Sequence, residues 1–173
     1  MNPRMILFLA ASGLCCALTS ADLPQRKAGL WEITMSPPNP KFPPTVERVC
    51  LDAATNALLY KAGAGAGKKL CSKTDVQSSG GKVVVDSVCK IGSTQATTHS
   101  VTILSGATGY HTDTAVHYDP PMFGRSESTS SQDGKWSGEC PADMKPGDIV
   151  VNPSPMMPVP LKMNLNDMLK AGD

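Results

Sequence analysis

The sequence has few aromatic residues, few charges and no excess of either charge sign. Aromatic residues make up 5% of the 173-residue chain. Charged residues make up 18%, below the roughly 25% of ordinary soluble domains. Sixteen basic residues stand against fifteen acidic ones, and this balance excludes the electrostatic footprint of a nucleic-acid-binding protein. The hydrophobic content of 40% is too high for a disordered chain, so length and composition predict one folded domain.

Long hydrophobic runs are also lacking. The apolar stretch at residues 5–18 is shorter than the about 20 residues that a membrane-spanning helix needs. It follows Arg4 and precedes the small residues Thr19-Ser20-Ala21, which is the pattern of a secretory signal peptide. We therefore expect residues 1–21 to be a cleaved signal peptide and the mature chain to have no transmembrane span.

A lipoprotein signal is the alternative interpretation of the same segment, because two cysteines follow the apolar core. A lipobox needs a small residue directly before its cysteine. Here Leu14 precedes Cys15, and Cys15 precedes Cys16, so the pattern favours the cleavable signal.

Closely spaced Cys-x-x-Cys pairs are absent from the remaining chain. Four cysteines stay after signal removal, an even number that predicts two disulfides in an oxidising compartment: Cys50, Cys71, Cys89 and Cys140. Their wide spacing argues against zinc and against thioredoxin-type redox chemistry. Of the three connectivities we favour Cys50–Cys71 with Cys89–Cys140, because the first pair closes a short local loop.

What the sequence does contain is a series of short strand patterns. Alternating polar and apolar residues predict strands at 29–35, 45–51, 69–78, 82–91, 95–104, 109–118, 125–132 and 135–140. Residues 79–81, 105–108 and Asp133-Gly134 are the predicted hairpin turns between them. Pro120-Pro121 is expected to end the sixth strand, because proline cannot donate to the ladder.

These patterns predict an all-β fold, an antiparallel meander of about eight short strands curled into a barrel or half-barrel. One short helix is expected at residues 52–61, capped by Asp52. The predicted organisation is a signal peptide at 1–21, a disulfide-stapled β domain at 22–140 and a Pro/Met-rich C-terminal tail at 141–173. Residues 164–170 within the tail are expected to form one or two helical turns.

Several short blocks resemble the bacterial domain-of-unknown-function family 3617. The opening block is Arg26–Ile33 (RKAGLWEI), the closing block is Lys135–Cys140 (KWSGEC), and cysteine blocks lie between them at Val49-Cys50-Leu51, Leu70-Cys71 and Val88-Cys89-Lys90. The resemblance covers about residues 26–140. It implies a small exported protein of Gram-negative bacteria, located in the periplasm. It implies no activity and no catalytic residues, because the family has none established.

Catalytic motifs are matched only in part. Residues 62–69 (AGAGAGKK) lack the first glycine and the final Ser or Thr of a phosphate-binding loop. Ser-x-x-Lys occurs at 79–82 and 87–90, on a predicted turn and a predicted strand, whereas that nucleophile pair needs a helix. No Gly-x-Ser-x-Gly elbow supports a Ser-His-Asp triad, which only geometry reveals.

Candidate metal ligands are histidines and methionines. His111 and His117 share a strand face but are about 20 Å apart on a straight strand, too far for one metal, and His99 lies on the preceding strand. The C-terminal tail offers soft thioether ligands for Cu(I): Met156, Met157 and Met163. Methionines that fill gaps at an open end of the core are the alternative.

The two tryptophans, Trp31 and Trp136, are expected to anchor the core, with the floor of an apolar ligand pocket as the alternative. We thus predict a non-enzymatic β domain with no cofactor. It would bind a small apolar molecule or an envelope protein, and no nucleic acid. Copper handling through the C-terminal methionines and a histidine is the second hypothesis, and a hydrolase is the third.

Overall fold

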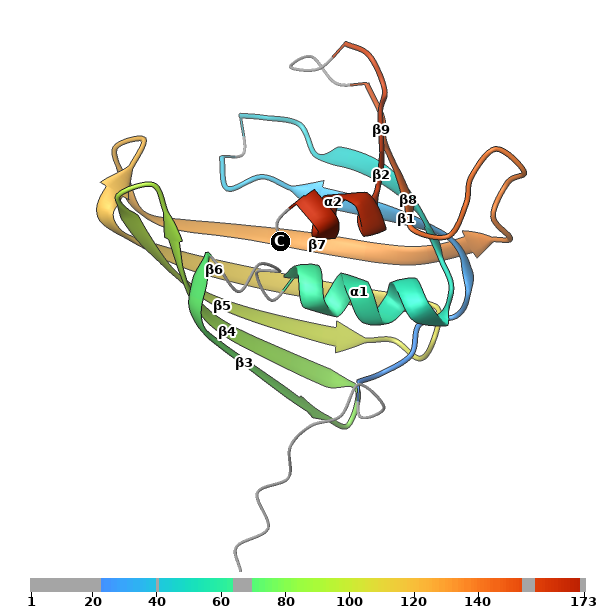
Figure 1. The fold of residues 1–173 in the computed structure, drawn as a ribbon, viewed down its shortest axis with the longest axis horizontal. Coiled ribbons are helices and arrows are strands. Elements are labelled where there is room, and N and C mark those ends of the chain that lie inside the picture. The colour runs from blue at the N-terminus through green and yellow to red at the C-terminus, as the bar shows by residue number, and fades with distance from the viewer. Residues whose placement is uncertain (1–22, 40, 64–69, 154–157, 172–173) are drawn as a thin grey trace, which may run out of the picture.

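The computed structural model describes residues 23–39, 41–63, 70–153 and 158–171 (Figure 1). Its strands form one antiparallel sheet in the order β3-β4-β5-β6-β7-β1-β2-β8-β9, with β3 and β9 at the two edges. The strands are β1 (Gly29–Ser36), β2 (Thr45–Leu51), β3 (Cys71–Ser79), β4 (Lys82–Ile91), β5 (Thr94–Leu104), β6 (Gly109–Met122), β7 (Arg125–Gly138), β8 (Asp148–Val151) and β9 (Leu161–Asn164). The all-β antiparallel fold is confirmed, and the curved sheet stays open rather than closing into a barrel.

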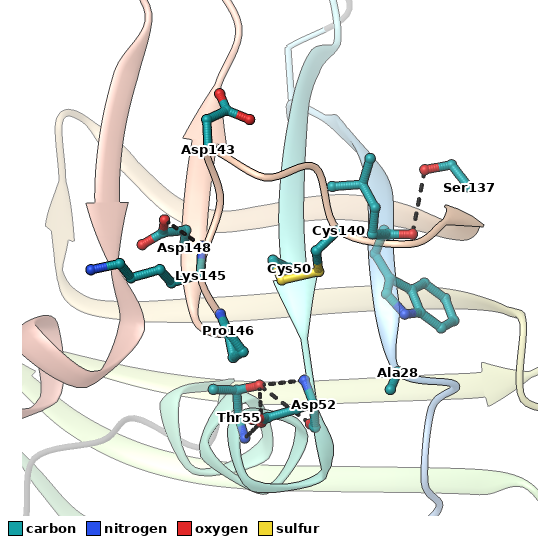
Figure 2. Close-up of a disulfide and its surroundings, with 12 residues drawn as sticks. Ala28, Cys50, Asp52, Thr55, Ser137, Cys140, Asp143, Lys145, Pro146 and Asp148 are labelled. Atoms are coloured by element: carbon teal, nitrogen blue, oxygen red, sulfur yellow. Dashed lines mark hydrogen bonds between the residues drawn. A yellow bond between two sulfur atoms is a disulfide. The ribbon is translucent and has the colours of Figure 1, made fainter.

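Two helices, α1 (Ala53–Gly63) and α2 (Leu165–Ala171), lie on the same face of the sheet (Figure 1). We call this the inner face. The core forms where these helices meet β1, β2 and β8, and its buried members are Trp31, Ile33, Val49, Leu51, Tyr110, Ile149 and Leu165. Helix α1 begins where expected, because Thr55 N donates to Asp52 Oδ1 and Asp52 N donates to Thr55 Oγ1 (Figure 2). The hydrogen bonds that the Asp52 carboxylate accepts from Thr55 N and from the Thr55 hydroxyl hold the pKa of Asp52 below its ordinary value.

Away from this core the inner face carries paired hydroxyl groups on β5 and β6, beside the buried Val83 and Ala96. Ser100 pairs with Thr114, and Thr102 pairs with Thr112, at oxygen–oxygen distances of 3.0 and 2.8 Å. These residues lie directly opposite each other on β5 and β6. On the inner face, the apolar core is therefore concentrated near β1, β2 and β8, and cross-strand hydrogen bonds join β5 to β6 farther along the sheet.

The hairpin predicted at Asp133-Gly134 is wrong, because both residues lie inside β7. Gly134 is opposite Tyr110 on β6, and the aromatic ring covers it: a Cβ at residue 134 would lie 2.0 Å from Tyr110 Cε1. The glycine therefore makes room for a ring rather than a turn. The turn between β6 and β7 is instead Phe123-Gly124, since Met122 pairs with Arg125. Pro120-Pro121 disturbs the ladder, whose register shifts between His117 and Met122, without ending β6 before Met122.

Both disulfides form, but the favoured connectivity is wrong: Cys50 is bonded to Cys140 (Figure 2), and Cys71 is bonded to Cys89. Cys71 and Cys89 are opposite each other on neighbouring strands, β3 and β4. Cys50 lies on β2 and Cys140 follows β7, so this bond spans β1, which lies between those strands. Sheet order, rather than loop length, determines which cysteines meet.

The C-terminal segment expected as a tail contributes elements to the same sheet. Strand β8 pairs with β2, β9 pairs with β8, and α2 places Leu165 in the core at 1% exposure. The helix expected at residues 164–170 is confirmed as α2. Asp148 fixes the turn before β8 by accepting hydrogen bonds from Lys145 N and Asn164 Nδ2 (Figure 2 shows Lys145 and Asp148).

Candidate functional site

The outer face of the sheet, opposite the helices, carries all three histidines of the chain, and each has a carboxylate as its direct cross-strand neighbour. The pairs are His99 with Asp86, His111 with Asp133, and His117 with Glu127. In each pair a histidine Nδ1 contacts a carboxylate oxygen, at 2.7 Å for the first two. Each acid therefore fixes the orientation of its ring.

His111 differs from the other two histidines in contacting a second carboxylate, because Asp113 also lies 3.3 Å from its Nε2. The hydrogen bond to Asp133 is the main cause that raises the pKa of His111, and Asp113 acts in the same direction. All these side chains are about half exposed or more, so water screens the pairs and their contribution to stability is small. Both ring nitrogens of His111 are engaged by carboxylates, so neither has a free lone pair for a metal.

A hollow of about 400 Å³ opens on this face, and we call it the outer hollow. Two successive rungs of the sheet form its floor, one with His99, Ala115 and Thr129, the other with Val101, Asp113, Ser131 and Ser36. Pro37 and Pro38, at the start of the β1–β2 loop, line the hollow too. Ala115 on β6 and Thr129 and Ser131 on β7 have small side chains, and these leave the space of the hollow open. Pro37, Pro38 and His99 border that space.

The chemistry of the outer hollow is mixed. Val101, Ala115 and the two prolines supply apolar surface, while Asp113 supplies a carboxylate and His99 a ring nitrogen. Asp86 engages Nδ1 of His99, so Nε2 is the nitrogen left for a ligand. The hollow can therefore contact an apolar body and accept hydrogen bonds from polar groups attached to it.

A second hollow, of about 540 Å³, lies next to the Cys71–Cys89 disulfide, and Leu70, Val88 and Lys90 are among its lining residues. It has no carboxylate and no histidine in its lining. Its polar side chains are Ser72, Lys90, Ser93 and Gln95.

The tryptophans lie at the side of the sheet where the core is, and neither lines the two hollows. Trp31 is fully buried, and its Nε1 donates to the Lys27 carbonyl at 2.9 Å. Trp136 Nε1 donates to the Ala28 carbonyl, and Lys27 Nζ lies 3.4 Å from the centre of its ring. Both rings therefore fasten the segment before β1 to the sheet.

Of the methionines predicted as Cu(I) ligands, Met156 and Met157 lie outside the described residues. Met163, on β9, packs against the apolar core. Within the ranges that the structure describes, there is no group of three or more His, Cys, Asp or Glu residues that could hold a metal ion. The Ser-x-x-Lys match at Ser79 and Lys82 falls on either side of the β3–β4 turn.

The outer hollow was missed in the sequence because its residues come from four strands. Alternation places His99 with Val101, and Asp113 with Ala115, on one face of their strands. The register that brings Asp86 opposite His99 is set by turn geometry, which alternation does not report.

A family model describing proteins of unknown function, DUF3617, matches residues 26–140. The chain belongs to this family. No curated protein and no solved structure matches it. The DUF3617 region runs from the segment before β1 to Cys140, and includes both disulfides but not β8, β9 or α2.

The opening block of the DUF3617 region has a structural role. Arg26 stacks on the rings of Tyr60 and Tyr110, at 4.6 and 4.5 Å, and its Nη1 donates to Asn56 Oδ1. Burial raises the pKa of Tyr110 to about 12, so its hydroxyl stays neutral beside this cation. Arg26 therefore links α1 to the sheet.

The two disulfides of this DUF3617 protein are consistent with an exported protein. In the part of the chain that the structure describes, neither helix has the length and apolar character needed to cross a bilayer.

Proposed function

We propose that this DUF3617 protein is a periplasmic β domain that binds a small molecule in the outer hollow, with a binding rather than a catalytic role. The observation that carries the proposal is the hollow itself. Its volume of about 400 Å³ is in the range of roughly 300–1,000 Å³ typical of small-molecule sites. Its lining combines apolar surface with a few convergent polar groups, as such sites do.

The lining also suggests the class of ligand. Asp113, Nε2 of His99 and the hydroxyls of Thr129 and Ser131 favour a molecule that donates hydrogen bonds. Pro37, Pro38 and Val101 favour one that has an apolar body as well. A small amphiphile with an amine or hydroxyl group has both properties.

Native mass spectrometry tests this proposal on protein released from its own envelope by spheroplast formation. We expect a retained small molecule on the wild-type protein, and release in that fraction would itself support the periplasmic location. Ala115→Trp fills the floor of the hollow and should abolish the retained mass. Thr97→Trp, on the same face but outside the hollow, is the matched control and should keep it. Wild-type protein that carries nothing, or equal retention in both variants, would refute the assignment.

Hydrolysis is a second candidate, favoured by one feature of the same hollow. Asp86 orients His99 through Nδ1, and Ser36, Thr129 and Ser131 supply hydroxyls nearby. A fluorophosphonate probe distinguishes the two functions. Covalent labelling that His99→Ala removes would indicate a nucleophile, whereas an unlabelled protein that retains its ligand would indicate binding alone.

A further inference from the structure

One end of the sheet carries most of the exposed large apolar side chains. At this end β1, β4, β6 and β8 finish, and the remaining strands begin; we call it the loop end. Of the nine large hydrophobic side chains exposed among the described residues, only Ile103 and Met168 lie elsewhere. Five of those at the loop end lie in or next to its connections, and together they are called the apolar rim: Phe42, Leu70, Ile91, Phe123 and Val159.

Phe123 is the most unusual member of the apolar rim. It occupies the first position of the two-residue turn between β6 and β7, with φ of 50°, and Gly124 follows with φ of 75°. Turns of this kind prefer Asn-Gly or Gly-Gly, because positive φ is unfavourable for bulky side chains. The Phe123 side chain is also 97% exposed. Phe123 thus combines an unfavourable backbone conformation with an apolar ring exposed to water, and no described residue covers the ring.

Basic residues accompany the apolar rim. Lys41 precedes Phe42, Lys90 precedes Ile91, and Arg125 follows the Phe123-Gly124 turn, all three exposed. Two exposed acidic side chains lie near the same turn, Asp119 on β6 and Glu127 on β7. Lys162, beside the β8–β9 connection, is engaged by Asp148 at 3.1 Å and is therefore not counted here. The loop end is therefore apolar at its turns, and the three basic residues beside them outnumber these two acidic ones.

We propose that the loop end docks on the surface of an anionic phospholipid bilayer. Apolar side chains that enter the interfacial region, flanked by cations that meet anionic headgroups, are the two components of peripheral membrane binding. The residues of the apolar rim belong to separate connections of a nine-stranded sheet, and that sheet spans roughly 40 Å at the usual strand spacing. A pocket on a protein partner receives one or two such tips, whereas a bilayer surface receives all of them.

The arrangement of the connections agrees with one broad contact. Figure 1 shows these connections following one another from the β6–β7 turn at the left of the view, through the β1–β2 connection, to the described ends of the β8–β9 connection at the top. The outer hollow lies on a sheet face, and the apolar rim contributes none of its lining residues. The proposal of membrane docking and the proposal of ligand binding therefore rest on different residues, and an experiment can refute one without refuting the other.

Vesicle co-sedimentation tests the proposal. The full chain is expressed with its own leader and purified from the periplasmic extract, and intact mass establishes that every variant has the same N-terminus. Probe vesicles contain phosphatidylcholine alone or a 3:1 mixture of phosphatidylcholine and phosphatidylglycerol. We expect binding to the anionic vesicles that weakens as salt is raised, and much weaker binding to the neutral ones.

Phe123→Asn is the decisive variant because it creates Asn-Gly, the sequence that this turn prefers. We expect its melting temperature to equal or exceed that of the wild type. Its partition into anionic vesicles should fall about tenfold, the effect of withdrawing one large apolar side chain from the interface. A loss of binding without a loss of stability cannot be attributed to misfolding.

Ile103→Asn is the matched control, since Ile103 is also an exposed large hydrophobic residue but lies at the opposite end of the sheet. It should leave vesicle binding unchanged. Wild-type protein that sediments with neither type of vesicle would overturn the proposal, and the apolar rim would then require a protein partner. Equal binding by wild type, Phe123→Asn and Ile103→Asn would overturn it as well.

Discussion

At the scale of single residues, two aromatic side chains show opposite relations to glycine. Tyr110 lies over Gly134 inside the sheet, where the absence of a side chain makes room for the ring. Phe123 precedes Gly124 in a turn, where the backbone itself favours small residues. The first glycine is required by packing and the second by conformation. A glycine in a sequence can therefore indicate either a turn or a close packing contact. The residue opposite it on the neighbouring strand shows which of the two applies.

Gly134→Ala tests the packing role. The added Cβ would lie 2.0 Å from the Tyr110 ring, so the ring must leave the position in which it packs with Trp31 at a centroid distance of 5.7 Å. We expect a loss of about 2–3 kcal/mol in the free energy of unfolding, the usual cost of overpacking a core. Gly109→Ala is the control, because a Cβ there meets its nearest atom at 3.5 Å. Urea denaturation that shows equal stability for both variants would refute this account of Gly134.

At the scale of elements, the position of β8 depends on the charged turn that precedes it. Asp148 accepts from Lys145 N, Asn164 Nδ2 and Lys162 Nζ, and these bonds hold its pKa at about 2, below the ordinary value of 3.8. The hydrogen bond from Lys145 N is the largest cause. The carboxylate thus joins the start of β8 to β9, and so connects the C-terminal elements to the sheet.

Asp148→Asn tests this connection through pH. A carboxyl group whose pKa is lowered by folding stabilises the folded state above its unfolded pKa, and this contribution is lost as pH falls toward the folded value. We therefore expect the variant to be less stable than the wild type at pH 7, with the difference shrinking between about pH 4 and pH 2. Melting curves at both ends of this range provide the measurement. A stability difference that does not change with pH would contradict the role of the charge.

Elements were also the level at which sequence reasoning worked best. Alternation identified most of the strands, and the cap at Asp52 placed α1 within a few residues. The patterns missed β8 and β9, and they divided β7 into two strands. The division arose at Asp133-Gly134, a pair that is typical of a turn when only its own segment is considered, although Tyr110, on another strand, explains the glycine. The outer hollow could not be predicted for the same reason, since its rungs depend on the register of four strands. Register follows from turns and bulges, including the shift between His117 and Met122.

At the scale of the whole molecule, the inner face of an open sheet has an apolar core near β1, β2 and β8, and hydroxyl pairs between β5 and β6. The two disulfides divide between these parts. Cys50–Cys140 connects β2 to the end of β7 across the core strands, and Cys71–Cys89 joins β3 to β4 at the far edge. The first therefore closes most of the DUF3617 region into one loop, while the second closes a single hairpin.

The two bonds should differ in their contribution to stability. The sequence separations are 90 and 18 residues, and the chain-entropy estimate gives about 4.6 kcal/mol for the first and about 3.2 kcal/mol for the second. We expect Cys50→Ala/Cys140→Ala to lower the melting temperature more than Cys71→Ala/Cys89→Ala, with peptide mapping of the wild type to establish the pairing. The reverse order would show that the hairpin disulfide, rather than the bond across β1, maintains the fold. Since the Cys71–Cys89 bond lies at the edge formed by β3, far from the buried cluster around Trp31, we expect its removal to loosen that edge and leave the core intact.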